Sequence, residues 1–260
     1  MLPTLRSAVD ALWITTQAEQ TWCVLEEQLL HSRIADLVLL RLDVDLLEGR
    51  LAGGWDRPLR LPEIRVLRAL RQQRPASPSA VADATRLRET TVVGALRTLE
   101  RDHFVERTAT GTYVRLAPSG SLAERVVSFE AKRDDAKRAL EQARGHLAWA
   151  DETYVAFDRA YAARFEVPRP AYARVGIGLL SLSPGQWRVE LRARPRRRRS
   201  GLEAAVVGER ALGRLLDHPR HDRPERRLPH GGGLSKESEP HLAGQRAGEV
   251  RALRRKYRKP

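Results

Sequence analysis

The sequence predicts a mixed α/β fold in which a helical module interrupts a sheet-forming domain and a basic tail follows. Three observations lead to this fold class. Apolar runs of strand length lie at 22–47 and again at 124–132. Between these runs, apolar residues recur at helical spacing in three short segments. Beyond residue 196, arginine, proline and glycine largely replace the apolar runs.

Composition narrows the protein class. The chain has 260 residues, 42% hydrophobic, with a formal net charge of +14. Most of that charge lies in 192–260, which hold 20 Lys/Arg against 8 Asp/Glu. Cys23 is the only cysteine, so an internal disulfide and a cysteine zinc cluster are excluded. With no signal peptide and no apolar run near the ~18 residues of a membrane span, we expect a cytoplasmic protein with a polyanionic partner and no membrane.

The first elements alternate between helix and strand signals. Residues 3–19 have weak helical periodicity through Leu5 and Val9, and 22–30 and 33–47 are predicted strands. The second run is apolar on both faces, which is typical of a central strand. Residues 49–62, rich in glycine and proline, are a predicted linker.

Three short helices and a hairpin are predicted next. Pro62 suits the first turn of a helix, Ser79 is the predicted cap of a second helix, and 90–102 form a third after a turn at 86–89. A hairpin follows Phe104, turning at Ala-Thr-Gly. The residues expected to be buried are Ile64, Leu67 and Leu70 in the first helix, Val81 and Ala84 in the second, and Val92, Leu96 and Leu99 in the third.

The opposite stripe of the third helix suits duplex DNA. A helix of this kind fits the major groove, and a hairpin tip can reach the backbone beside it. Thr90 and Thr91 lie at the helix N-terminus, where free N–H groups favour phosphate, and Arg97 is placed to read a base edge. Gly94 lies on the same stripe. The arginines expected to neutralise backbone charge are Arg86, Arg88, Arg101 and Arg107.

Residues 59–117, with TTVVGALRTLERDHFVER ahead of the hairpin, resemble winged-helix regulators of the MarR type. The resemblance implies a winged-helix domain with double-stranded DNA as its partner. Winged helices also serve as protein-interaction modules, and that alternative stays open.

After the module, the strand and helix signals resume. Strands are predicted at 124–132, 152–158, 175–182 and 186–193, and helices at 134–151, 159–165 and 202–216. The buried residues of the helix at 134–151 are expected to be Ala136, Leu140, Ala143 and Leu147. Residues 217–260 are predicted to be disordered.

A carboxylate and an ammonium group share one face of the strand at 124–132. Glu130 and Lys132 alternate with Phe129 and Ala131, so they point the same way. Such a pair can help to bind Mg²⁺ and position an attacking water, but the metal needs a second carboxylate. Asp36 is the candidate if its strand is adjacent, and Gln142 in the next helix could point back toward Lys132.

This pattern resembles the PD-(D/E)XK nuclease superfamily, with its restriction-endonuclease-like αβββαβ core. The resemblance implies that Asp36 and Glu130 bind Mg²⁺ or Mn²⁺, that Lys132 activates water, and that Gln142 supports it. Glu27 matches the family's upstream acid, with Glu26 as a rival. The long gap from Asp36 to Glu130 fits only if the winged helix is inserted between two neighbouring strands. The plain alternative is a surface strand that ends in a salt-bridged pair.

The main hypothesis is therefore a metal-dependent nuclease or nuclease-like DNA-processing protein. The alternative is a non-catalytic winged-helix transcriptional regulator, and a third is a protein-interaction module. The expected organisation is a nuclease-like domain of 1–58 and 118–195, a winged helix of 59–117, and a basic tail of 196–260 with one helix. We allow for a homodimer.

Overall fold

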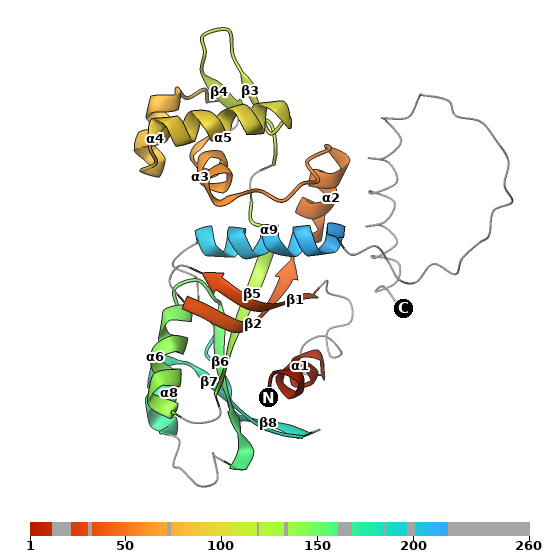
Figure 1. Ribbon diagram of the computed structural model, residues 1–260, viewed down its shortest axis with the longest axis vertical. Coiled ribbons are helices and arrows are strands. Elements are labelled where there is room, and N and C mark those ends of the chain that lie inside the picture. The colour runs from red at the N-terminus through yellow and green to blue at the C-terminus, as the bar shows by residue number, and fades with distance from the viewer. Residues whose placement is uncertain are drawn as a thin grey trace, which may run out of the picture. The chain divides into compact units, whose positions relative to one another are not determined.

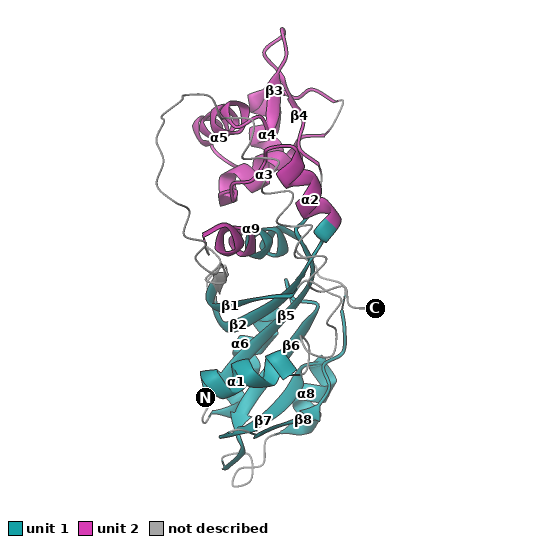
Figure 2. Cartoon of the chain, turned by 90° about the vertical axis from the view of Figure 1, so that its right-hand side faces the viewer, with its two compact units in different colours: residues 1–44, 120–208, 257–260 teal, residues 45–119, 209–256 magenta. Residues whose placement is uncertain are grey.

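The computed structural model describes residues 1–11, 22–30, 33–71, 74–118, 120–132, 135–160, 168–184, 186–196 and 201–217. These residues divide into two compact units, coloured separately in Figure 2. Of the described residues, unit 1 comprises those within 1–44 and 120–208, and unit 2 comprises those within 45–119 and 209–217. Within the described residues, no helix has the length and apolarity needed to cross a membrane.

Unit 1 is built on a mixed sheet with the strand order β1-β2-β5-β6-β7-β8 (Figure 1). The strands are β1 (Trp22–Leu30), β2 (Arg33–Leu42), β5 (Ala123–Lys132), β6 (Glu152–Asp158), β7 (Gly178–Ser183) and β8 (Gln186–Leu191). β2 pairs antiparallel with β1 and β5, whereas β6 pairs parallel with β5 and β7. The mixed sheet of the predicted fold class is confirmed.

The chain leaves the sheet after β2 and returns at β5, and these two strands are direct neighbours. The backbone N–H of Asp43 donates to the carbonyl of Leu122 at 2.9 Å, so the exit and the return lie side by side. The element order in unit 1 is α1 (Leu2–Val9), β1, β2, β5, α6 (Ala136–His146), β6. The helix-bearing segment therefore lies in the chain between two neighbouring strands of the sheet.

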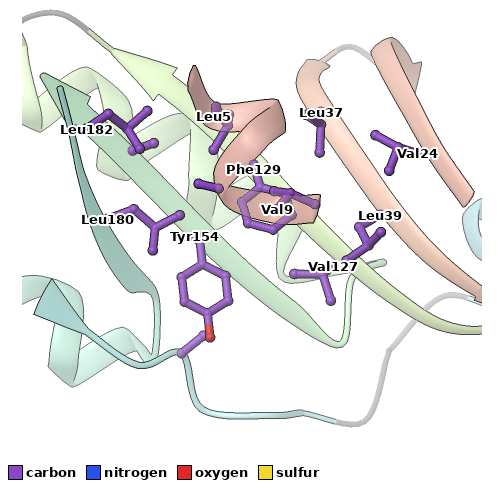
Figure 3. Packing of buried hydrophobic residues seen from close by; sticks show 13 residues of the cluster. Leu5, Val9, Val24, Leu37, Leu39, Val127, Phe129, Tyr154, Leu180 and Leu182 are labelled. Atoms are coloured by element: carbon purple, nitrogen blue, oxygen red, sulfur yellow. The ribbon is translucent and has the colours of Figure 1, made fainter. Parts of the chain in front are cut away.

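One face of the sheet packs against α1. Leu5 and Val9 of this helix lie over Phe129 and Tyr154 (Figure 3), whose rings stack with centroids 5.6 Å apart. Leu37 and Leu39 of β2 contribute from the same face. Each Å² of apolar surface that is buried between α1 and the sheet contributes roughly 25 cal/mol to the stability of unit 1.

The other face of the sheet is covered by α6 and by α8 (Arg169–Val175). Ala139, Leu140 and Ala143 of α6 pack in one cluster with Val155 and other residues of β6 and β7. Because helices cover both faces, β2 and β6 need apolar residues at nearly every position. Asp36, Glu130 and Lys132 alternate with the residues packed under α1, so they belong to this second face.

Unit 2 contains the predicted helical module. Its elements are α2 (Val44–Ala52), α3 (Leu61–Ala69), α4 (Pro78–Thr85), α5 (Glu89–Arg101), β3 (Val105–Arg107) and β4 (Tyr113–Arg115). β3 and β4 form an antiparallel hairpin whose turn contains Gly111 at φ +77°. The buried core includes all the predicted residues except Ala84, which is exposed, namely Ile64, Leu67, Leu70, Val81, Val92, Leu96 and Leu99, with Phe104.

Several predicted boundaries are wrong, and the helix expected at 134–151 is shorter, from Ala136 to His146. The strand expected at 33–47 ends at Leu42, because α2 begins at Val44 with Asp45 in its first turn, where a negative charge favours a helix. The linker is accordingly shorter than 49–62. α4 is capped by Ser77, which accepts the N–H of Ala80, and not by Ser79. The strand expected from 175 begins at Gly178, after α8 has ended at a left-handed Gly176.

The C-terminal helix was predicted at 202–216 and is present as α9 (Gly201–Asp217). Its residues up to Gly208 belong to unit 1, and those from Glu209 belong to unit 2. Its buried side chains include Ala204, Val207, Ala211 and Leu212, so it is part of the packed structure and not of a solvated tail. The predicted disorder of residues 218–260, and most of the helix predicted at 159–165, lie outside the described residues.

Candidate functional site

The first candidate site is the exposed face of α5 in unit 2. The inner face of α5 is anchored by Val92, Leu96 and Leu99, which are buried among residues of α3 and the hairpin. All seven residues predicted to contact DNA are exposed, namely Arg86, Arg88, Thr90, Thr91, Arg97, Arg101 and Arg107. The amphipathic period therefore places one stripe of α5 toward solvent over its whole length.

The residues at the two ends of α5 are held by the local backbone. Arg86 ends α4 in the left-handed conformation at φ +55°, which turns the chain toward α5. Arg88 is the N-cap residue of α5, and Thr90 and Thr91 lie in its first turn. Arg101 donates to Asp102 at 3.1 Å, so part of its charge is neutralised within the protein.

Sequence reasoning missed an ion network that fixes the end of α5. Arg57 donates to Asp102 and, at 2.9 Å, to Glu63 at the start of α3. Burial alone would raise the pKa of Asp102, but hydrogen bonds from Arg101 and Arg57 outweigh it, and this pKa lies below its ordinary value. The available local signal was an acid, Glu63, three residues after Arg60, and Glu63 does accept the N–H of Arg60 at 2.8 Å.

The second candidate site lies in unit 1, where β2 and β5 pair. The register places Leu37 opposite Phe129, and one step further Asp36 falls opposite Glu130. A carboxylate oxygen of Asp36 accepts the N–H of Ala131 at 2.7 Å, which holds this side chain beside β5. Lys132 Nζ lies 2.8 Å from Glu130 Oε1. The structure therefore brings together Asp36, Glu130 and Lys132.

Glu130 is an unusual carboxylate because its side chain is only 1% exposed. Its Oε1 is paired with Lys132, whereas its Oε2 is buried and accepts no hydrogen bond. Burial raises the pKa of Glu130, and the charge of Asp36 raises it further, against the opposing effects of Lys132 and Arg138. A buried oxygen without a partner costs about 1–3 kcal/mol, and more when it is charged.

Among the described residues, Gln142 and Glu27 are the two remaining ones predicted for this site, and neither forms a hydrogen bond or an ion pair with Asp36, Glu130 or Lys132. Gln142 lies on α6, which packs against β5, and its Oε1 is also buried without a hydrogen-bond partner. Glu27 lies on β1, between the pairs Glu26–Leu37 and Gln28–Ala35, which is the register position across from Asp36. Its φ of +48° interrupts the regular strand, and its side chain is exposed.

The donor set fits a divalent cation that keeps part of its water shell. Mg²⁺ is commonly bound through one or two carboxylates, with water and substrate oxygens completing its coordination. Asp36 and Glu130 supply two such carboxylates, and Glu130 Oε2 is a buried oxygen without a partner. The described residues contain no group of three or more acidic, histidine or cysteine side chains placed to hold a metal, so protein ligands alone would not saturate the ion.

Three helices followed by a hairpin, α3 to β4, have the element order of a winged-helix module, a class in which an exposed helix commonly docks on DNA. A family model described as the MarR family matches residues 59–110, which run from the start of α3 into the hairpin turn. No curated protein and no solved structure shows significant similarity to the chain. The match confirms the MarR-type part of the predicted resemblance and supports DNA binding, and none of the comparisons supports the PD-(D/E)XK part.

Proposed function

We propose that this chain is a DNA-binding protein whose sheet carries a metal-dependent phosphodiesterase centre. The observation that carries the proposal is the meeting of Asp36 and Glu130 on neighbouring strands, with Lys132 beside Glu130. A whole helical module separates these residues in the chain, so their meeting is not a consequence of sequence proximity. The Glu-x-Lys spacing and the αβββαβ element order support the same conclusion.

Each residue has a distinct part in this proposal. Asp36 and Glu130 would hold Mg²⁺ or Mn²⁺, and the bound ion would supply Lewis-acid stabilisation of charge on the phosphodiester. Lys132 pairs with Glu130 and favours its charged form, and its ammonium would stabilise the negative charge that develops on the oxygen of the attacking water. Gln142 contributes a buried amide oxygen from α6. The exposed face of α5 holds duplex DNA.

We expect Lys132→Ala to reduce Mg²⁺- or Mn²⁺-dependent cleavage of duplex DNA by a factor of about 10²–10⁴, because the positioned ammonium is lost. Cleavage of a supercoiled plasmid is the measurement, and circular dichroism checks that the variant is folded. Lys137→Ala is the matched control. Lys137 belongs to another acid-x-Lys sequence, Asp135-Ala136-Lys137, is exposed at the start of α6, and should be dispensable.

Unchanged cleavage in Lys132→Ala, or no cleavage by the wild type with either metal, would overturn the nuclease assignment. Equal loss in Lys132→Ala and Lys137→Ala would also count against it, because it would point to a general effect of charge and not to the β2–β5 centre.

A transcriptional regulator without catalysis is the second candidate function, and the MarR-family match at 59–110 supports it directly. The nuclease proposal, in contrast, depends on the geometry of unit 1. In the regulator, unit 1 is a scaffold or a partner-binding platform. A homodimer belongs to this candidate, because two-fold related recognition helices fit the two half-sites of a palindrome.

For both functions we expect Arg97→Ala to weaken binding to duplex DNA by about 1–3 kcal/mol, since Arg97 lies in the middle of the exposed stripe of α5. Fluorescence anisotropy at several salt concentrations measures the effect. Arg65→Ala in α3 serves as a control that removes the same charge from unit 2 outside that stripe. DNA affinity that is insensitive to salt, or equal in both variants, would instead favour the protein-interaction module.

A further inference from the structure

Gly94 is unusual among the residues of α5 because neither the backbone conformation nor the packing of the helix requires a glycine there. It lies in the middle of a 13-residue helix, where glycine is less favourable than alanine by up to about 1 kcal/mol. A Cβ atom added at Gly94 would meet no atom within 4 Å. Packing within the protein therefore does not explain the missing side chain.

Other glycines of the structure do have a steric reason. At Gly208 in α9, an added Cβ would lie 2.9 Å from the backbone nitrogen of Ala123. At Gly178 in β7 it would collide with the ring of Tyr154. Both positions are closed by neighbouring protein atoms, whereas the space over Gly94 is open.

The surroundings of Gly94 indicate what occupies that space. It is exposed on the stripe that also carries Thr90, Arg97 and Arg101, all of them exposed. Its carbonyl also accepts the hydroxyl of Thr98 at 3.1 Å. The centre of the stripe is thus a flat patch of helix backbone, flanked by hydroxyl and guanidinium groups that suit a polyanion with hydrogen-bonding edges.

We propose that Gly94 is a positioning residue for DNA: it lets the backbone of α5 approach the base pairs in the major groove closely enough for Thr90 and Arg97 to reach base edges. This inference deepens the proposed DNA-binding function and depends on it. A side chain at residue 94 would lift the centre of α5 away from the groove floor. Base readout would suffer first, while backbone contacts made by the long arginines would persist.

The experiment compares Gly94→Ala and Gly94→Leu with the wild type. Duplexes with a randomised centre are first selected with the wild-type protein, and affinities are then measured for the selected duplex and for the starting pool. We expect the melting temperature of Gly94→Ala to rise by about 2–4 °C. Its affinity for the selected duplex should fall roughly tenfold, the scale of one good base contact, and that of Gly94→Leu should fall further. Affinity for the pool should change little.

Gly49→Ala is the matched control, because Gly49 is a similarly exposed glycine in α2 whose added Cβ also meets no atom within 4 Å. It should raise the melting temperature without changing either affinity. Retained affinity of both Gly94 variants for the selected duplex overturns this inference while leaving DNA binding intact. Failure of the wild type to enrich any sequence also overturns it, provided binding to the pool is salt-sensitive. No binding to the pool refutes DNA binding itself.

Discussion

Glu209→Met is expected to lower the free energy of unfolding by about 3–5 kcal/mol, because it leaves the guanidinium of Arg50 buried without its counter-charge. Arg50 Nη1 lies 2.5 Å from Glu209 Oε1, and the two side chains are only 6% and 10% exposed. An arginine stays protonated in proteins, so the buried charge of Arg50 cannot be neutralised by loss of a proton. Chemical denaturation of the full chain at neutral pH measures the effect.

The companion variants make this prediction specific. Burial raises the pKa of Glu209, against the opposing charge of Arg50 and the N–H of Leu59. In Arg50→Met the carboxyl can therefore be protonated at mildly acidic pH, so the loss should shrink there, whereas the loss in Glu209→Met should not. The double variant Arg50→Met/Glu209→Met should be close to the wild type in stability or above it. A double variant as unstable as the worse single variant would show that the pair itself is strongly stabilising.

Glu130→Gln is expected to raise the stability of the metal-free protein at neutral pH by about 1–3 kcal/mol, since it removes a buried charge with an unpaired oxygen. The pKa of Glu130 is raised in the folded state, so the folded protein holds this proton more tightly than the unfolded chain does. Charge on Glu130 therefore costs stability as pH rises from the ordinary range of a glutamate through its folded pKa. The advantage of Glu130→Gln should be small below that window and full above it.

Thermal unfolding across this pH range, with and without Mn²⁺, measures the prediction. Mn²⁺ should raise the melting temperature of the wild type and not that of Glu130→Gln, because binding to the folded state alone is stabilising. Glu124→Gln is the control, an acid on the same strand that is half-exposed and paired with Arg41. If Glu130→Gln is less stable than the wild type at neutral pH without metal, Glu130 is a structural residue, and the salt-bridged pair at a strand end is the better description.

Residues with a strong local pattern were predictable from the sequence. The strand at 152–158 matches β6 at both ends, because its apolar residues lie between the acids Asp151-Glu152 and the charged pair Asp158-Arg159. The adjacency of Asp36 and Glu130 was predictable only through a chemical argument, since a metal site needs its two acids together. The turn into α2 was not predictable from apolar pattern alone, because VDLL fits a strand or a helix equally well.

Long-range contacts were beyond sequence reasoning. Nothing in the local sequence of Arg50 indicates Glu209 as its partner, and α9 was assigned to a tail because arginine-rich residues precede it. The left-handed Glu27 is a similar case: its φ of +48° depends on how β1 meets β2 and not on a residue type that favours this conformation. The spacing of apolar residues along a helix or a strand indicates which of its faces is buried, but it does not identify the element that packs against that face.

The insertion between β2 and β5 has a consequence for synthesis on the ribosome. A chain made from its N-terminus presents all of α3, α4, α5 and the hairpin before β5 has been translated, so the winged helix can fold while the sheet still lacks its central partner strand. Glu209 is translated much later than Arg50, so Arg50 lacks this ion-pair partner until the C-terminal helix has left the ribosome. The order of translation thus separates an early local folding step from a late one, in which the C-terminal helix completes the ion pair.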